Sequence, residues 1–420
     1  MSLTRLSVED ASAHMLAGVG ALTDEPVELR ESLGRVLARD VVSPVSLPPW
    51  DNASMDGFAV RAADVRGASA LAPVCLRVIE TIAAGRRGTR AVGTGEAARI
   101  MTGAPLPEGA DSVVRVEDTA GGPDDVEIRD DRDASSNVRA AGEDVRAGVT
   151  VMRAGATIGA AQLGVLASVG CARPFVHRRP RVAILATGDE LVTLEDFDEV
   201  VAGRRIVSSN SYSLEAAVRA AGGEPVPVGI APDDPAGLAA HLRSADGCDM
   251  IVTCGGVSVG DFDYTRAVVA ELGGELSLWR VRMRPGAPLG FGRLFGAPWI
   301  GLPGNPVSAL VTFELFGRPL LRTLAGSTRP HRRTLPVVLD EEITLRAPLT
   351  HFLRCVLRDG EDGTLRARLT GAQSAGMLTS MSSADALLVV PPEPSVRPAG
   401  SALRVLPLDG DLGGSDRFLA

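Results

Sequence analysis

Residues 181–324 alternate short apolar runs with amphipathic stretches, and this pattern constrains the fold more than any other feature of the chain. Strand-length runs followed by helix-length segments are typical of βαβ units, which build a parallel sheet with helices on both faces. We therefore expect a doubly wound, mostly parallel α/β domain, with Asn210 and Asp233 as helix N-caps. The expected strands are residues 182–186, 226–230, 250–254, 278–283 and 299–302. The expected helices are residues 210–221, 233–243, 264–272 and 305–324.

The segments on either side of this region have a different pattern. Ser7 is expected to cap an amphipathic helix, and residues 60–128 contain short apolar runs cut by glycine, proline and aspartate, as in a small β-rich domain. Residues 121–133 are expected to form a polar, acidic loop. A chain of 420 residues exceeds one ordinary core, so several domains are expected. We predict a split N-terminal dimerisation or linker domain (1–50 with 138–178), an inserted β-rich domain (51–137), the α/β domain (179–327) and a C-terminal β-barrel-like domain (331–410).

The basic residues are unusual because the 43 lysine and arginine positions contain no lysine. This excludes a Walker A lysine, a Schiff-base lysine and a lysine general base. Arginine stays protonated, so these side chains can bind anions but cannot exchange protons. A formal net charge of -9 argues against a protein that coats nucleic acid or acidic membranes.

The cysteines and the uncharged segments indicate where the protein resides. Five dispersed cysteines without a CxxC pair, after an acidic N-terminus, favour a cytoplasmic protein with reduced thiols. Residues 154–172 carry no charge over nineteen positions, the length of a membrane span. They contain several glycines and few large apolar residues, so we expect a short buried helix at 160–168 and no membrane partner.

The sharpest candidate for a ligand site is the Gly-rich turn at residues 254–263, which follows an expected strand and precedes an expected helix. Its glycines permit a tight turn and bring backbone N–H groups close to a phosphate. In an open α/β sheet, ligands bind at the carboxyl ends of the strands, where this turn lies. A tight turn without a ligand is the alternative. The candidate binding residues are Gly255, Gly256, Ser258 and Gly260.

A second loop ends the first strand of the same domain, at Thr187, Gly188, Asp189 and Glu190. Paired carboxylates at this edge suit a hard cation such as Mg²⁺ beside a phosphate. A helix cap with two solvated acids explains the same residues equally well.

A third loop, residues 301–308, ends another strand and opens the long helix. Its prolines fix the backbone, and free N–H groups with Ser308 can hold an anion. Arg280, Arg282 and Arg284 precede it and are expected on one face of a single strand. An anion clamp and a solvated edge strand are both compatible with this pattern. The candidate binding residues of the loop are Pro303, Asn305, Pro306 and Ser308.

Residues 51–57 and 99–105, outside the α/β domain, are also dense in functional side chains, but composition alone does not distinguish sites from loops there. The five histidines are isolated, so a zinc site is not expected.

Taken together, these segments resemble the molybdopterin molybdotransferase family, which includes the MoeA proteins and the gephyrin E domain. The resemblance extends over about residues 5–404 and is carried by seven segments in the family's order. They are residues 51–60, 99–111, 142–144, 187–191, 255–265, 301–309 and 373–381.

The resemblance implies insertion of molybdenum from molybdate into adenylylated molybdopterin, with release of AMP and with Mg²⁺ as cofactor. It also implies a homodimer whose site lies between the α/β domain of one subunit and the β-rich domain of the other. Adenylyltransferases that supply the substrate and apo-molybdoenzymes that receive the product are possible partners. The positions that match family residues tied to activity are Asp56, Thr102, Asp144, Glu190, Asp233 and Asp263, with Pro303 and Pro306 as loop framework.

By the same resemblance, Glu190, Asp263 and Asp261 are expected to hold Mg²⁺, and Arg280 and Arg284 stand where the family usually has lysines. Ala287 replaces a basic residue that is common in the family. Two other functions remain as alternatives, a molybdopterin adenylyltransferase and a noncatalytic scaffold like gephyrin.

Overall fold

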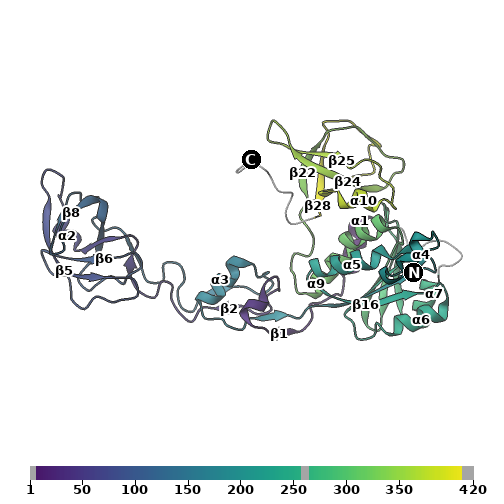
Figure 1. Ribbon diagram of the computed structural model, residues 1–420, viewed down its shortest axis with the longest axis horizontal. Coiled ribbons are helices and arrows are strands. Elements are labelled where there is room, and N and C mark those ends of the chain that lie inside the picture. The colour runs from purple at the N-terminus through teal and green to yellow at the C-terminus, as the bar shows by residue number, and fades with distance from the viewer. Residues whose placement is uncertain (1–5, 257–263, 409–420) are drawn as a thin grey trace.

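The structure is a computed structural model that describes residues 6–256 and 264–408. The chain is elongated, with a β-rich sheet at one end, an α/β sheet at the other and a small connecting region between them (Figure 1). A C-terminal β barrel stands beside the α/β part. No helix in the described ranges is both long and apolar enough to cross a membrane.

The central sheet of the α/β part has six strands in the order β16-β13-β17-β21-β20-β18. The first four pair in parallel, and at one edge β20 pairs antiparallel with β21 and β18 pairs antiparallel with β20. This arrangement confirms the predicted mostly parallel α/β class. The strands are β13 (Arg181–Thr187), β16 (Glu224–Ala231), β17 (Met250–Cys254), β18 (Glu275–Arg280), β20 (Pro288–Leu294) and β21 (Ala297–Leu302).

Helices cover both faces of this sheet because each face carries its own apolar core. One core takes residues from α1, α5, α8 and α9, and the other takes residues from α6 and α7. The long C-terminal helix contains a π-helical turn at Phe313–Gly317 between α8 and α9. The helices are α1 (Val8–Leu16), α5 (Ser209–Ala220), α6 (Pro235–Arg243), α7 (Thr265–Glu271), α8 (Pro306–Thr312) and α9 (Arg318–Leu324).

The helix caps differ from two of the predictions. Ser7 caps α1 as expected, since its side chain accepts a hydrogen bond from Asp10 N. Ser208, not Asn210, is the N-cap of α5, and Asp234, not Asp233, caps α6 by accepting from Gly237 N. Both predictions were wrong by one or two residues, which leaves the side chains of Asn210 and Asp233 available for other contacts.

The β-rich part contains a six-stranded sheet in the order β7-β4-β6-β5-β9-β8, with a core on each face. Strand β9 lies inside the segment 121–133 that was expected to be a loop, so that expectation was wrong. Val126 and Ile128 alternate along β9 and both are buried in the core. Their burial favours a strand here in spite of the acidic residues around them. The elements are β4 (Gly57–Val60), α2 (Ala62–Val65), β5 (Val74–Ile82), β6 (Glu96–Ile100), β7 (Ser112–Arg115), β8 (Thr119–Gly121) and β9 (Asp125–Ile128).

The connecting region is built from two-stranded ribbons and helix α3 (Ala160–Ser168). The helix was predicted to be buried, but Leu166 is the one residue of α3 that is buried. Its other side chains are uncharged and remain partly or fully exposed. The strands are β1 (Asp24–Pro26), β2 (Val41–Val42), β3 (Asn52–Ala53), β10 (Val138–Arg139), β11 (Thr150–Met152) and β12 (Phe175–His177).

The C-terminal part is a β barrel, as predicted, because β24 pairs with both β25 and β26 and thereby closes the sheet. Strand β19 of the preceding segment extends this sheet through β24 and so joins the barrel to the α/β part. The elements are β19 (Met283–Arg284), β22 (Leu335–Leu339), β23 (Ile343–Thr344), β24 (Thr350–Asp359), β25 (Leu365–Leu369), α10 (Leu378–Ser382), β26 (Ala386–Val390), β27 (Val396–Arg397) and β28 (Ala402–Pro407).

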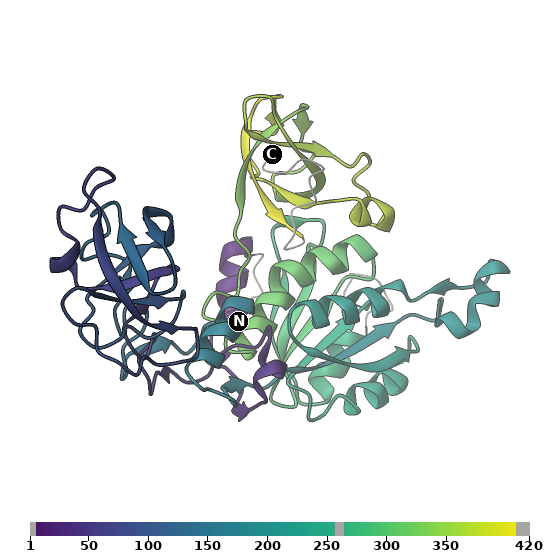
Figure 2. The same cartoon turned by 60° about the vertical axis from the view of Figure 1, so that its left-hand side comes forward.

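An arm that the sequence pattern did not predict projects from the α/β part (Figure 2). It consists of β14 (Leu191–Val192), α4 (Phe197–Val201) and β15 (Ile206–Val207), with β14 and β15 paired in parallel. Leu194, Phe197 and Val201 are 54%, 48% and 76% exposed on this arm. It therefore presents apolar side chains to its surroundings.

Candidate active site

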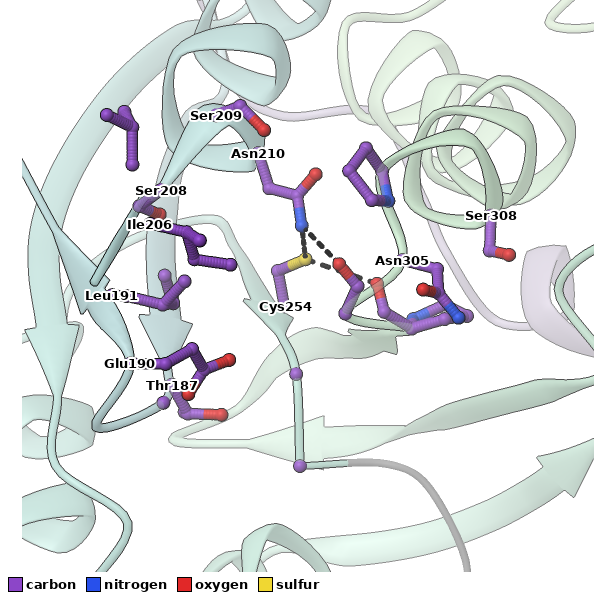
Figure 3. A pocket seen from close by; sticks show the side chains of 18 of the residues that line it. Thr187, Glu190, Leu191, Ile206, Ser208, Ser209, Asn210, Cys254, Asn305 and Ser308 are labelled. Atoms are coloured by element: carbon purple, nitrogen blue, oxygen red, sulfur yellow. Dashed lines mark hydrogen bonds between the residues drawn. The ribbon is translucent and has the colours of Figure 1, made fainter. Parts of the chain in front are cut away.

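The first cavity, of about 570 Å³, lies at the carboxyl ends of β13, β17 and β21, where an open α/β sheet binds ligands (Figure 3). Several predicted binding residues meet there from four loops. They are Thr187, Gly188, Glu190, Asp233, Gly255, Gly256, Pro303, Asn305, Pro306 and Ser308. Ser258, Gly260, Asp261 and Asp263 lie outside the described residues.

The turn after β17 requires glycine at both positions, because of its backbone conformation and its close neighbours. Gly255 and Gly256 have φ of 98° and 62°, which a residue with a Cβ rarely adopts. A Cβ on Gly255 would lie 2.7 Å from the hydroxyl oxygen of Thr187, and one on Gly256 would clash with that of Thr265. Both hydroxyls are buried without a hydrogen-bond partner among the described residues. The turn therefore packs against two buried hydroxyls, and that of Thr187 belongs to a residue that lines the cavity.

Asn210 links the loops of the cavity, a role that sequence reasoning missed because the residue was taken for a helix cap. Its Nδ2 donates to Cys254 Sγ at 3.1 Å and to Gly304 O at 2.7 Å, and the Cys254 thiol donates to Pro303 O at 3.3 Å (Figure 3). Burial raises the pKa of Cys254 to about 12, so the thiol stays protonated. These contacts join α5, β17 and the 303–305 loop into one wall.

The two acids of the Thr187–Glu190 loop have different environments. Asp189 accepts a hydrogen bond from Asp233 N at 3.2 Å, which fixes the loop that carries Asp233. Glu190 lines the cavity together with Asp233, but Asp189 does not. The pair that faces the cavity is thus Glu190 with Asp233, rather than the adjacent Asp189 and Glu190.

A second cavity, of about 890 Å³, lies between β19 and the barrel and shares Pro288 and Ser308 with the first. Arg284 lines it, whereas Arg280 lines neither cavity. The prediction of one strand carrying Arg280, Arg282 and Arg284 was wrong, because β18 ends at Arg280 and β19 begins at Met283 in the barrel sheet. Arg282 N donates to Leu6 O between them. Two adjoining cavities, one of them with an arginine at its wall, can hold a bipartite anionic substrate.

Arg354, in the wall of this second cavity, is a fully buried cation. Its Nε donates to Ser380 Oγ at 2.9 Å and its Nη1 to Gln373 O at 3.2 Å. Its Nη2 donates to Ala372 O at 3.1 Å and to Ser374 O at 3.0 Å. These acceptors are neutral, so they orient the guanidinium without cancelling its charge. The cavity wall therefore carries a positive charge suited to an anion.

Asp56 and Thr102 form a pair in the β-rich part, at a separate hollow of about 610 Å³ that also includes Arg115 and Arg132. Thr102 N and Thr102 Oγ1 donate to Asp56 Oδ1 at 2.8 and 2.7 Å. These two bonds lower the pKa of Asp56. Asp144 lies in the connecting region, where its backbone N donates to Leu47 O. In Figure 1 the β-rich sheet is at the opposite end of the molecule from the first cavity, so one chain does not unite Asp56 with Glu190.

Substitution of Thr102 by valine is expected to raise the pKa of Asp56 toward its ordinary value. The backbone N–H of Thr102 contributes most to the lowered pKa and is retained, so the rise should be partial. Titration of the Asp56 carboxyl by NMR measures it. Thr119→Val, which removes a hydroxyl bonded only to Val116 O, is the control and should leave Asp56 unchanged. An unchanged Asp56 titration in Thr102→Val would contradict the assignment.

The described residues fit a divalent cation only in part. No three His, Cys, Asp or Glu side chains among them form a metal-binding group. Glu190 and Asp233 both face the first cavity, and carboxylate oxygens are the ligands that Mg²⁺ prefers. Because Mg²⁺ is often held by one or two carboxylates plus substrate phosphates, the donor set suits a site that the substrate completes.

The matches to known sequences extend along the chain in the order of its structural parts. Residues 6–170 match the MoeA N-terminal region (domain I and II), residues 183–323 a probable molybdopterin binding domain and residues 336–408 the MoeA C-terminal region (domain IV). The fold and its cavities thus define a multidomain protein built around a molybdopterin-binding type of α/β domain.

Individual relatives identify the family. The chain is 41% identical over 385 residues to molybdopterin molybdenumtransferase 2 of Mycobacterium tuberculosis, covering 90% of this chain and 94% of that protein. It is 33% identical to molybdopterin molybdenumtransferase of Bacillus subtilis, covering 91% and 89%. The crystal structure of the molybdopterin biosynthesis moeA protein from Pyrococcus horikoshii superposes with a TM-score of 0.82 at 28% identity, covering 96% and 100%. The chain belongs to the MoeA family of molybdopterin molybdenumtransferases.

Proposed function

We propose that this chain is a molybdopterin molybdenumtransferase, which inserts molybdenum from molybdate into adenylylated molybdopterin and releases AMP. The observation that carries the proposal is the pair of adjoining cavities that share Pro288 and Ser308. One is a strand-end cavity with a Gly-Gly turn and carboxylates, and the other has arginines in its wall. The substrates are a nucleotide-linked pterin and an oxyanion, and the two cavities match these chemistries.

The pterin nucleotide occupies the first cavity in this proposal. The turn at Gly255 and Gly256 and the 303–308 loop receive its phosphates, and Glu190 with Asp233 faces them. Molybdate occupies the second cavity near Arg284. Charge-assisted hydrogen bonds to such anions contribute about 1.5–3 kcal/mol each. Arg280 lines neither cavity, so this proposal gives it no direct contact with the oxyanion.

Mg²⁺ is the proposed cofactor, held by Glu190, Asp261 and Asp263 together with substrate phosphates. When bound, it neutralises phosphate charge and so favours departure of AMP. The protein's own contribution is to orient the phosphates against the Gly-Gly turn and to place the carboxylates around them.

A homodimer completes the site in this proposal, with the β-rich domain (51–137) of one subunit facing the α/β domain (179–327) of the other. Two features support it. The Asp56–Thr102 pair is remote from the first cavity of its own chain (Figure 1). Helix α3 and the arm at 191–207 expose uncharged or apolar side chains, which a partner subunit would cover.

The same proposal places the protein in the cytoplasm, where its five free cysteines remain reduced. An adenylyltransferase that makes the substrate and apo-molybdoenzymes that take up the product are its proposed partners.

Incubation of the purified protein with adenylylated molybdopterin tests the function. We expect AMP release that depends on molybdate and on Mg²⁺, measured by nucleotide chromatography. Consumption of ATP with formation of the adenylylated pterin would instead identify an adenylyltransferase. Absence of both activities, with the protein folded, would favour a noncatalytic scaffold.

A further inference from the structure

Insertion of molybdenum requires protons to move from the substrate thiols. If the proposed function holds, the second cavity, where molybdate is placed, must supply a group that carries them. When molybdate reacts with the dithiol form of the pterin, two Mo–S bonds form and one Mo–O bond breaks. The two thiol protons leave with the departing oxygen as water, so the charge and the oxidation state of molybdenum are unchanged. A group beside the oxyanion must accept a thiol proton and return it to that oxygen.

Few side chains in this cavity can do so. Arg284, Arg346 and Arg354 line it but stay protonated. Glu342 is the one acidic side chain among the described residues that line the cavity. Among the described lining residues, His351 is the one whose type exchanges protons near neutral pH.

The hydrogen bonding of His351 fixes its tautomer. The ring Nδ1 lies 2.8 Å from Leu349 O. A carbonyl oxygen can only accept, so Nδ1 carries the hydrogen, and in the neutral ring Nε2 is then the unprotonated nitrogen. His351 is only 6% exposed, so its ring is held in place by its packing. The free lone pair on Nε2 is thus available to accept a proton.

The surroundings of His351 favour the neutral ring. It pairs with Arg284 across β19 and β24, and paired positions bring side chains together on one face. On its other side it pairs with Val390 of β26, a strand without ionisable residues. Glu342 and Arg346 come from the 342–349 segment and Arg354 from its own strand. Burial, and then the charge of Arg284, lower the pKa of His351.

We propose that His351 is a catalytic proton carrier in the oxyanion cavity: Nε2 accepts a proton from a substrate thiol and transfers it to the oxygen that leaves molybdenum. Arg284 and His351, which are paired across β19 and β24, have different roles in this proposal. Arg284 binds the oxyanion, and His351 moves the proton that the arginines lining this cavity cannot move.

His351→Asn tests the proposal because the asparagine amide nitrogen can still donate to Leu349 O while Nε2 is lost. General acid–base groups contribute typically about 10²–10⁴-fold, so we expect kcat for molybdate insertion to fall about 100-fold or more. The pH profile is the decisive measurement. In the wild type the rate should fall as pH decreases through the pKa of His351, since the imidazolium cannot accept a proton, and this acid limb should vanish in the variant.

A second variant and a control distinguish loss of the proton carrier from a general defect in folding. His351→Gln places an amide near Nε2 and should also lose the acid limb. His331→Asn changes a histidine that is exposed and lies outside both cavities, and it should retain the wild-type profile. If either folded His351 variant keeps the acid limb and a near-normal kcat, the proton-carrier role is wrong while the proposed function stands. If the wild type releases no AMP with molybdate, the proposed function and this inference both fail.

Discussion

A randomly exchanged mixture of Asp56→Asn and Glu190→Gln subunits is expected to recover about a quarter of wild-type activity, although each variant alone should be nearly inactive. In a two-fold symmetric dimer with sites shared between subunits, random exchange makes about half of the dimers mixed. Each mixed dimer has one site with both lesions and one intact site. Half of the dimers then have half of their sites intact, so about a quarter of all sites in the mixture are active.

The physical basis is the separation of the two residues within one chain. Asp56 lies in the β-rich part, where Thr102 holds its carboxylate, and Glu190 lines the cavity at the ends of the α/β strands. Figure 1 shows these parts at opposite ends of the molecule. Asparagine and glutamine remove the charges but preserve side-chain size, so loss of activity would report chemistry rather than packing.

The measurement is molybdate-dependent AMP release after co-expression of the two variants with different affinity tags. Purified variant dimers that are simply mixed without subunit exchange are the control and should stay inactive. If tandem-purified mixed dimers were inactive while both variants remained folded and dimeric, the shared site would be refuted.

Much of the α/β fold could be predicted because apolar residues in parallel strands are buried on both faces. Strand β17 begins and ends at Met250 and Cys254, the bounds expected from its uninterrupted apolar run. The alternation of strands and helices then determined the sheet type. The closed barrel and the inserted β-rich sheet were likewise expected from short alternating runs.

The wrong predictions have a common cause: they depend on contacts between residues far apart in the sequence, which a local sequence pattern does not reveal. Asn210 has the chemistry of an N-cap, but its amide binds Cys254 and Gly304, which are close only after the strands assemble. The arginines at 280–284 alternate as in one strand, yet the chain passes from one sheet to another between Arg280 and Met283. Helix α3 was expected to be buried from its lack of charge, and within one chain it is largely exposed.

Replacement of Arg354 by methionine should destabilise the C-terminal barrel and abolish oxyanion binding together. The guanidinium is fully buried and donates to Ser380 Oγ and to the carbonyl oxygens of Ala372, Gln373 and Ser374. Methionine fills a similar volume but donates nothing, so the four acceptors lose their bond from the guanidinium, although Ser374 O still accepts from Met377 N. Each unsatisfied buried group costs about 1–3 kcal/mol, and we expect a loss of about 3 kcal/mol or more in the free energy of unfolding.

The consequence reaches the active site because Gln373 and Ser374 line the second cavity. Loss of their hydrogen bonds to Arg354 releases that wall, and the positive charge disappears from the same place. Chemical denaturation measures the stability, and the KM for molybdate measures the binding.

Arg358→Met is the control, since Arg358 is exposed and pairs with Asp340 at 2.6 Å on the barrel surface. Exposed ion pairs contribute about 0–1 kcal/mol, so this control should remain close to the wild type. If Arg354→Met were as stable and as active as Arg358→Met, the buried cation would not support this wall, and the oxyanion would have to be bound by Arg284 and Arg346 alone.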